Sequence, residues 1–138
     1  IHADDFFLPQ NLKTKERLSE IGGNINYELI KETLEKVKKA WENDEKIITI
    51  QAYDCEKEIY YSKDIELKDK VLIEGVYSYH PYFNSLIDKC AYLFVDQSTQ
   101  IERIMLRDNG DRFLNEWMPL ENKYFEKYKF LDNADIII

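Results

Sequence analysis

Residues 71–77 have the sequence Val71-Leu72-Ile73-Glu74-Gly75-Val76-Tyr77, an apolar run that ends in a carboxylate. The same pattern opens the chain, in Ile1-His2-Ala3-Asp4-Asp5-Phe6-Phe7-Leu8-Pro9. Short apolar runs of this kind are typical of strands buried in a parallel sheet. Because ligands bind outside the carboxyl ends of such strands, we expect Asp4 and Glu74 to face a reacting group at one edge of the sheet.

Strands and helices are expected to alternate along the rest of the chain. The expected strands cover residues 1–3, 46–53, 58–61, 70–74, 91–95 and 134–138, with a charged turn region at residues 63–69. The expected helices cover residues 13–21, 26–43, 81–86, 98–107 and 111–130, with caps at Asn26 and Ser98 and an interruption at Pro119. This alternation predicts an α/β fold, a parallel sheet with helices on both faces, in one domain that spans residues 1–138.

Composition narrows the classes of function. The 138 residues are 44% hydrophobic and 33% charged, which is ordinary for a globular domain, and the formal net charge is -8. An acidic chain is not expected to bind nucleic acid broadly, because that needs a basic surface. No signal peptide or membrane-spanning run is visible, and Cys55 and Cys90 fit no metal spacing. We therefore expect a cytoplasmic protein with two reduced thiols, in contact with neither membrane nor nucleic acid.

Three carboxylates are candidates for chemistry at the predicted sheet edge. Asp4 directly follows an apolar stretch, so it could accept a proton from a substrate hydroxyl. Glu74 could hold magnesium, directly or through water, since magnesium prefers one or two carboxylates together with substrate phosphates. The structural alternatives are that Asp5 caps the following turn and that Glu74 bonds to backbone at the end of its strand. Gly75, which allows a sharp exit close to a ligand, favours function for Glu74.

Basic side chains gather later in the sequence, at Arg103, Arg107 and Arg112. Arg103 and Arg107 are four residues apart and share one face of the predicted helix. Guanidinium groups offer paired donors to phosphate oxygens, and a mobile arginine segment over a phosphoryl donor would act as a lid. The alternative is a solvated helix face on which the arginines pair with Glu102, Asp108 and Asp111.

An aromatic cluster follows Glu74 and includes Tyr77, Tyr79, Tyr82, Phe83 and His80. It could line an apolar substrate slot, but core packing and loop cover explain it more simply. His2 lies inside the first predicted strand and is expected to pack there.

Taken together, these features resemble the uridine kinase family of P-loop phosphotransferases, and more specifically its bacterial uridine kinase-like members. The resemblance covers nearly the whole chain in the right order, although no single motif is decisive. The matching stretches are residues 3–9, 22–28, 53–54, 73–78, 107–108, 117–125 and 134–138.

The resemblance implies roles for individual residues. Asp4 matches the base toward the nucleoside hydroxyl, and Glu74 matches the acid near magnesium and the phosphates. Tyr53 matches a nucleoside-contacting tyrosine, and Asn26 falls where relatives often have an aspartate that contacts the substrate. Among the arginines, Arg107 falls on the lid arginine and Arg112 lies near a second phosphate or substrate contact.

Two departures accompany these matches. The phosphate loop of the family, G-x-x-x-x-G-K-[ST], is not found in the sequence, and neither is the adenine-side segment after the last strand. Both chain ends fall inside predicted strands, so we expect a longer parent protein that carries the N-terminal strand and phosphate loop.

These observations favour an ATP-dependent, magnesium-assisted transfer of a phosphoryl group to a hydroxyl of a nucleoside such as uridine or cytidine. Two alternatives stay open. The chain could be a non-catalytic module that binds a nucleotide or a partner, or it could belong to a kinase of another small hydroxylated metabolite. The oligomeric state is not readable from the sequence.

Overall fold

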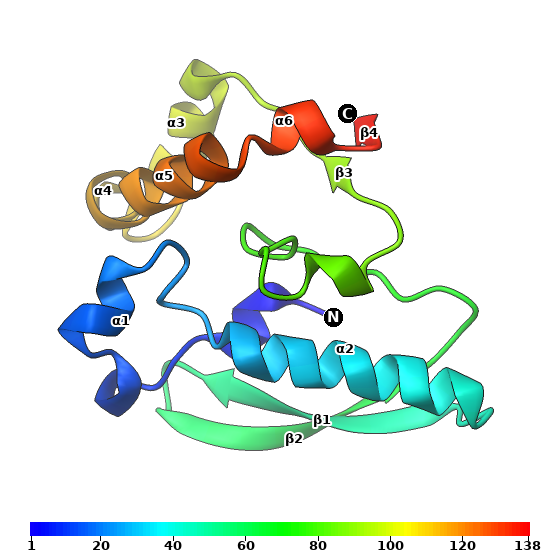
Figure 1. Cartoon of the computed structure of the whole chain (residues 1–138). Coiled ribbons are helices and arrows are strands. Elements are labelled where there is room, and N and C mark those ends of the chain that lie inside the picture. Colours follow the sequence, from blue (N-terminus) through cyan, green and yellow to red (C-terminus); the bar gives the residue numbers. More distant parts are fainter. The chain divides into compact units, whose positions relative to one another are not determined.

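The computed structural model describes all 138 residues, which divide into two compact units, Ile1–Ile87 and Asp88–Ile138. The assignment of residues 1–138 to a single domain stays a prediction. Figure 1 shows the element order along the chain. No helix is long and apolar enough to cross a membrane. Both cysteines are free, as the sequence predicts.

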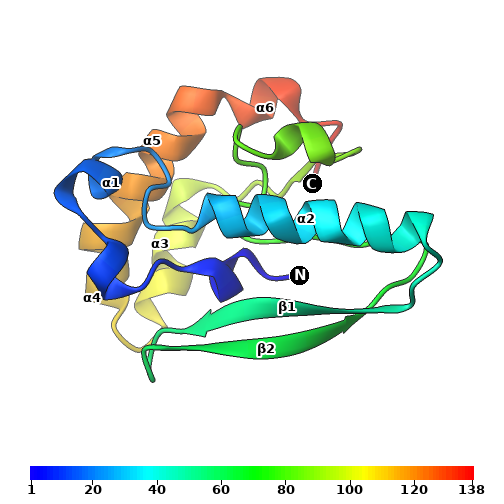
Figure 2. The ribbon, with the colours of Figure 1, turned by 60° about the horizontal axis from the view of Figure 1, so that its bottom comes forward.

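The first unit is built around one long helix and one β-hairpin. Helix α2 (Tyr27–Glu42) lies along the hairpin of β1 (Ile47–Asp54) and β2 (Ile59–Glu66) in both Figure 1 and Figure 2. The two strands are antiparallel. The shorter elements of this unit are η1 (Ala3–Phe6), η2 (Gln10–Leu12), α1 (Lys15–Ser19) and η3 (Asn84–Leu86).

Helix α2 forms where its sequence predicts a helix. Asn26 caps it by accepting a hydrogen bond at Oδ1 from the backbone N–H of Leu29, 3.0 Å away. The apolar positions recur at three and four residues, so one face is buried while the other carries charged residues. The buried side chains of the helix and of β1 that form the core of this unit are Ile30, Leu34, Val37, Ala40, Ile48, Ile50 and Ala52. Each of the larger ones contributes about 1.5–3 kcal/mol through burial.

The second strand of the hairpin is longer than predicted, because residues 63–66, expected as a turn, continue β2. Lys63 and Ile65 are half-buried, while Asp64 between them is exposed. This alternation is typical of a strand with one covered face. A charged strand of this kind looks like a turn in the sequence because only one side chain in two meets the protein.

The predicted strand at residues 70–74 is wrong in its burial and in its extent. Only Glu74 pairs, through an isolated parallel bridge with His2, and Leu72 is 75% exposed. The predicted strand at residues 1–3 likewise reduces to that bridge before η1 begins at Ala3. Within this unit the two segments, residues 1–3 and 70–74, pair with each other at one position only. They therefore form no buried strand.

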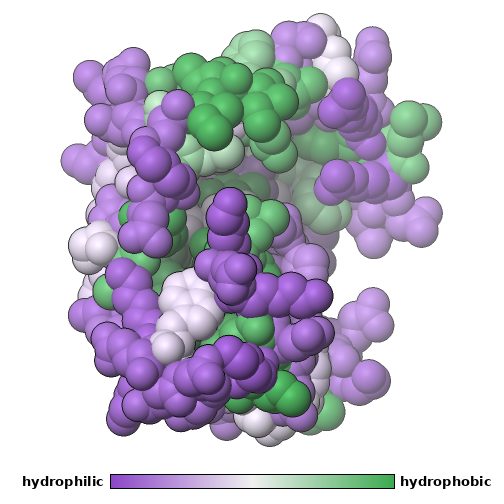
Figure 3. All heavy atoms as spheres, turned by 90° about the vertical axis from the view of Figure 1, so that its right-hand side faces the viewer, coloured by the Kyte–Doolittle hydropathy of each residue, from purple (hydrophilic) through white to green (hydrophobic).

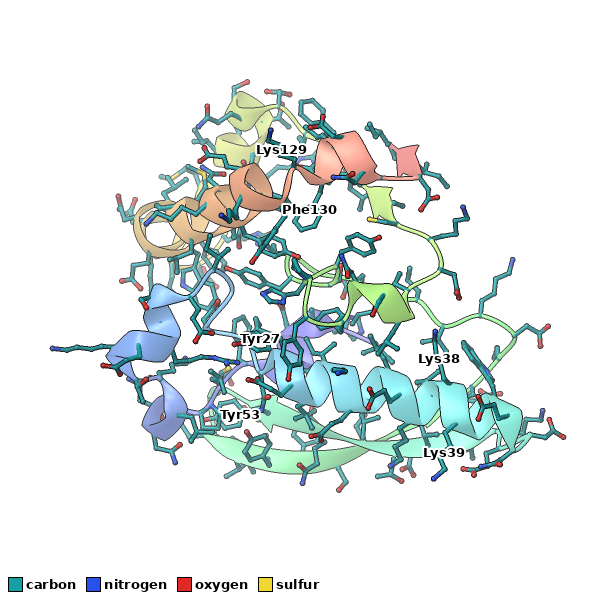
Figure 4. The ribbon with its side chains drawn as sticks, viewed as in Figure 1. Tyr27, Lys38, Lys39, Tyr53, Lys129 and Phe130 are labelled. Carbon is teal, nitrogen blue, oxygen red and sulfur yellow. The ribbon has the colours of Figure 1, made fainter.

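The second unit contains one short parallel strand pair and several helices. Strand β3 (Ala91–Tyr92) pairs in parallel with β4 (Ile136–Ile137). The helices are α3 (Gln97–Met105), α4 (Gly110–Arg112), the π-helical turn η4 (Phe113–Trp117), α5 (Met118–Tyr128) and α6 (Phe130–Asn133). Tyr124 and Phe130 are buried against each other, with ring centroids 4.7 Å apart. The chain turns between α5 and α6 at Lys129, whose φ is 46° (Figure 4).

Three predictions for this unit are corrected by the structure. The strand predicted at residues 91–95 is neither long nor buried, because Leu93 is 75% and Phe94 60% exposed. Apolar side chains, drawn in green, reach the surface in the view of Figure 3, and Leu93 and Phe94 are among the exposed apolar residues of this unit. Helix α3 is capped by Asp96 and not by Ser98, since Oδ1 of Asp96 accepts from the backbone N–H of Thr99 at 2.9 Å. The helix also ends at Met105, before Arg107.

The predicted parallel sheet is therefore confirmed only in part. Parallel pairing occurs in the β3–β4 pair and in the bridge between His2 and Glu74, whereas the longest strands form an antiparallel hairpin. The mixed helix and strand composition agrees with the predicted α/β class.

Candidate active site

Asp4 and Glu74 are brought to the same place by pairing between two segments that are distant in sequence. The backbone N–H of Ala3 donates to the carbonyl oxygen of Glu74 at 2.8 Å, and the N–H of Glu74 donates to the carbonyl of Ile1 at 3.0 Å. Asp4 follows this bridge directly, in the first turn of η1. The predicted neighbourhood of the two carboxylates therefore exists, although a single bridge builds it and not a sheet of buried strands.

Gly75 makes this close pairing possible. Its φ is +123°, a conformation that residues with a side chain rarely adopt. A Cβ built at this position would lie 2.9 Å from the Cβ of Ala3, which is too close for two carbon atoms. A side chain at position 75 would push the two segments apart, so Gly75 holds Glu74 beside the start of the chain.

The Asp4 carboxyl is in a negative environment. Its pKa is raised above the usual range, first by partial burial and then by the negative charges of Glu74 and Asp5, while His2 opposes the shift. Ionised Asp4 and Glu74 repel each other across the bridge. A cation placed beside them would relieve that repulsion.

Asp5 has a structural partner that the sequence did not indicate. Its Oδ2 accepts from Nζ of Lys63 on β2 at 2.8 Å, and its side chain is only 15% exposed. This ion pair ties η1 to the hairpin and therefore orients Asp4. The turn-capping alternative considered for Asp5 is replaced by this contact.

The side chain of Glu74 also has a partner, the imidazole of His2. The imidazole Nδ1 of His2 donates to Oε1 of Glu74, and both side chains are more than half exposed. The expectation that His2 packs inside a strand is wrong, because the parallel bridge places its side chain beside that of Glu74 at the surface. No group of three or more His, Cys, Asp or Glu residues is arranged to hold a metal ion without further ligands.

Tyr53 and Asn26 lie elsewhere in the first unit. Tyr53 is near the end of β1 (Figure 4), and its ring packs edge-on against Tyr60, with centroids 5.2 Å apart. Successive side chains of a strand point to opposite faces, so Tyr53 leaves β1 on the side opposite to Ala52. Asn26 uses Oδ1 as the cap of α2. Neither residue forms a hydrogen bond with Asp4 or Glu74, and their assignment to the substrate stays a prediction.

The three arginines belong to the second unit, and all of them are exposed. Arg103 lies on α3, while the Arg107 guanidinium lies 5.7 Å from the ring centroid of Phe113. Arg112 donates from Nε to Oε2 of Glu116 at 2.9 Å, an exposed pairing with an acid that the structural alternative did not name. Because Arg107 lies beyond the end of α3, the predicted shared helix face with Arg103 is not formed.

Sequence reasoning missed Arg17, which organises the loop beside the Asp4 segment. Its guanidinium donates to both carboxylate oxygens of Glu28 at 2.8 and 2.6 Å and to the carbonyls of Gly23 and Ile25. It also stacks 3.7 Å from the ring centroid of Tyr27. In turn, the carbonyl of Asn24 accepts from the backbone N–H of Leu8, and the N–H of Asn26 donates to the carbonyl of Phe6. Nothing in the sequence distinguishes Arg17 from a solvated helix residue, because its partners are set by the fold.

Three members of the aromatic cluster after Glu74 pack as core, as the simpler interpretation predicts, whereas Tyr82 is 48% exposed. Tyr77, His80 and Phe83 are buried. His80 stacks on Tyr27 with centroids 4.8 Å apart and planes inclined by 6°; Figure 4 labels Tyr27 at the start of α2. Burial lowers the pKa of His80, whose Nε2–H donates to the carbonyl of Ile21 at 3.1 Å. The ring is a structural element of this unit.

Comparison with solved structures identifies a similar fold. The chain matches a structure described as that of a possible uridine kinase from Bacillus stearothermophilus, with a TM-score of 0.69 and 19% sequence identity. The match covers 100% of this chain and 70% of that chain. No protein-family model and no curated protein matches the sequence. At this identity the likeness shows the fold alone: the chain folds like that possible uridine kinase.

Proposed function

We propose that this chain supplies the acceptor side of an ATP-dependent kinase that phosphorylates a hydroxyl of a nucleoside, uridine or cytidine in the first instance. The observation that carries the proposal is the meeting of Asp4 and Glu74 at the bridge between residues 1–3 and 74. The likeness in fold to a possible uridine kinase supports the same reaction class.

In this proposal Asp4 is the base. A carboxylate with a raised pKa holds a proton more strongly than ordinary aspartate, which suits it to accept one from a hydroxyl as the phosphoryl group arrives. Asp4 lies in the first turn of η1, and the ion pair between Asp5 and Lys63 fixes this turn to β2. The Asp4 carboxyl is therefore held in one position. Holding the reacting groups in position is the main source of rate enhancement in phosphoryl transfer.

The carboxylates fit a magnesium ion that arrives with the phosphoryl donor. Glu74 offers one carboxylate and Asp4 lies beside it, while no third protein ligand stands ready. Magnesium commonly takes one or two carboxylates and fills its remaining positions with substrate phosphates and water. When bound, the ion would supply stabilisation of the negative charge that develops on the phosphate oxygens.

The remaining candidate residues complete the proposal. Arg103, Arg107 and Arg112 would bind phosphate oxygens of the donor, with Arg107 stabilising the transferred charge. Tyr53 would contact the nucleoside. Asn26 would meet the substrate through Nδ2, because its Oδ1 is engaged in the cap of α2.

The direct test is Asp4→Asn in the full-length protein. The amide keeps the shape of the side chain and loses the basic oxygen, so we expect kcat to fall by about 10²- to 10⁴-fold while KM for the acceptor changes little. Asp69→Asn, an exposed loop aspartate of the same unit, is the matched control and should leave kcat unchanged. Phosphorylation by Asp4→Asn at a rate near that of the wild type would show that the base is assigned wrongly.

The acceptor is tested separately by thermal shift. Ligands that bind the folded protein raise its stability, so uridine or cytidine should raise Tm more than pantothenate or sugar alcohols. A larger shift with one of the latter would move the proposal to a kinase of another hydroxylated metabolite. A nucleoside shift without turnover would favour a non-catalytic binding module.

A further inference from the structure

His2 is placed next to Glu74 by backbone pairing and not by chance contact of two mobile side chains. The two residues face each other across a parallel bridge whose flanking hydrogen bonds are 2.8 and 3.0 Å long. Gly75 keeps the segments at this separation, since a Cβ at that position would meet Ala3 at 2.9 Å. The imidazole is therefore delivered to the carboxylate by the same backbone contact that brings Asp4 there.

Glu74 needs such a partner if its carboxylate is to hold one orientation. Its side chain is 55% exposed and has three rotatable bonds, so solvent alone would leave it free to turn away. Nδ1 of His2 engages Oε1 and leaves Oε2 available to a cation. Residues that hydrogen-bond to a metal-binding carboxylate fix its direction, and their removal commonly weakens metal binding.

We propose that His2 is a positioning residue, which through Nδ1 holds the Glu74 carboxylate toward the cation that accompanies the phosphoryl donor. The inference rests on the proposed function, because it assumes that Glu74 meets a divalent ion. It assigns His2 no proton transfer and no contact with the substrate. The requirement is a hydrogen-bond donor at the position of Nδ1.

The test measures binding of Mn²⁺ to the full-length protein by electron paramagnetic resonance, in the presence of a non-hydrolysable ATP analogue. The variants are His2→Ala, which removes the donor, and His2→Asn, whose amide nitrogen lies near the position of Nδ1. We expect His2→Ala to weaken Mn²⁺ binding by about tenfold, the lower end of the usual range because the pair is exposed. His2→Asn should recover most of the affinity.

Two further variants make the outcomes distinct. Glu74→Gln should weaken Mn²⁺ binding at least as much as His2→Ala, whereas Lys89→Ala, which breaks an exposed 2.7 Å pair with Asp135 in the other unit, should not change it. If Glu74→Gln weakens binding and His2→Ala does not, or if His2→Asn is as weak as His2→Ala, His2 is not a positioning residue. If Glu74→Gln itself leaves the affinity unchanged, the metal role of Glu74 in the proposed function is wrong, and the inference falls with it.

Discussion

The two units of this chain differ in how fully they bury their apolar residues. In the first, α2 covers the inner face of β1, and Ile30 and Ala52 are fully buried. In the second, β3 and β4 pair over two residues, and Ile136, Ile137 and Ile138 are 54–69% exposed. Each of these strands has one partner in its sheet, and β1 is covered in addition by α2, so burial follows from the helix packed on the strand and not from apolar composition alone.

The largest effect is expected from Ile30→Ala, which truncates a buried side chain of α2. The side chain is fully buried, so truncation leaves a cavity and should lower the free energy of unfolding by about 2–5 kcal/mol in urea titrations. Ile137→Ala in β4 is the matched control, and it should cost less than about 0.5 kcal/mol because the residue already faces solvent. Similar losses for both variants would contradict the contrast between the units.

The pairing around Glu74 is tested by Gly75→Ala. The new Cβ combines a disfavoured φ with a collision at Ala3, and we expect a loss of about 2–3 kcal/mol in chemical unfolding. Adding Ala3→Gly removes the collision but not the strain, so the double variant should be less destabilised than the sum of the two single variants. Strict additivity in this cycle would show that the two residues do not meet.

Arg17→Lys should lower the free energy of unfolding by about 2 kcal/mol, although it keeps the positive charge. Lysine cannot reproduce the two parallel hydrogen bonds to Glu28 or the stacking on Tyr27. The midpoint of urea unfolding measures the loss. For comparison, Lys89→Ala breaks an exposed ion pair of the second unit and should leave the midpoint of urea unfolding nearly unchanged. Equal losses of stability for Arg17→Lys and Lys89→Ala would show that the Arg17 contacts stabilise the protein no more than an exposed ion pair does.

The smallest effect concerns Asp4 and pH. A carboxyl whose pKa is higher in the folded protein than in the unfolded chain binds its proton more tightly when folded, so ionisation lowers stability as pH rises above the unfolded-state pKa. Asp4→Asn should therefore stabilise the protein near pH 7, by less than about 1 kcal/mol because the side chain reaches solvent. The gain should vanish below about pH 3, where the wild-type carboxyl is protonated in both states. A loss of stability near pH 7 would contradict the raised pKa.

Local sequence patterns predicted the elements whose stability is local. Helix α2 begins after Asn26 and ends at Glu42, as the cap and the apolar spacing indicated, and β1 differs from its prediction by one residue at each end. The buried strands predicted at residues 70–74 and 91–95 are not formed as such. An apolar run shows that a segment prefers burial, but whether it is buried depends on partners that lie far away in the sequence.

The candidate site shows the same division. The positions of Asp4 and Glu74 after apolar runs indicated that the two carboxylates would meet, and the bridge between residues 1–3 and 74 brings them together. The side chains that pair with the acids of this site, Lys63 with Asp5 and His2 with Glu74, could not be predicted from the sequence. Each such pair joins segments that are adjacent only after the chain has folded.

By itself, the sequence determined the long helix, the first strand of the hairpin and the two carboxylates that follow apolar residues, because capping, periodicity and turn chemistry act between near neighbours. The tertiary structure alone decided which apolar residues are covered and which cation or imidazole meets each carboxylate. Burial and electrostatic pairing act between atoms that are close in space, and this chain brings those atoms together through a few long-range contacts, such as the close approach of Gly75 to Ala3.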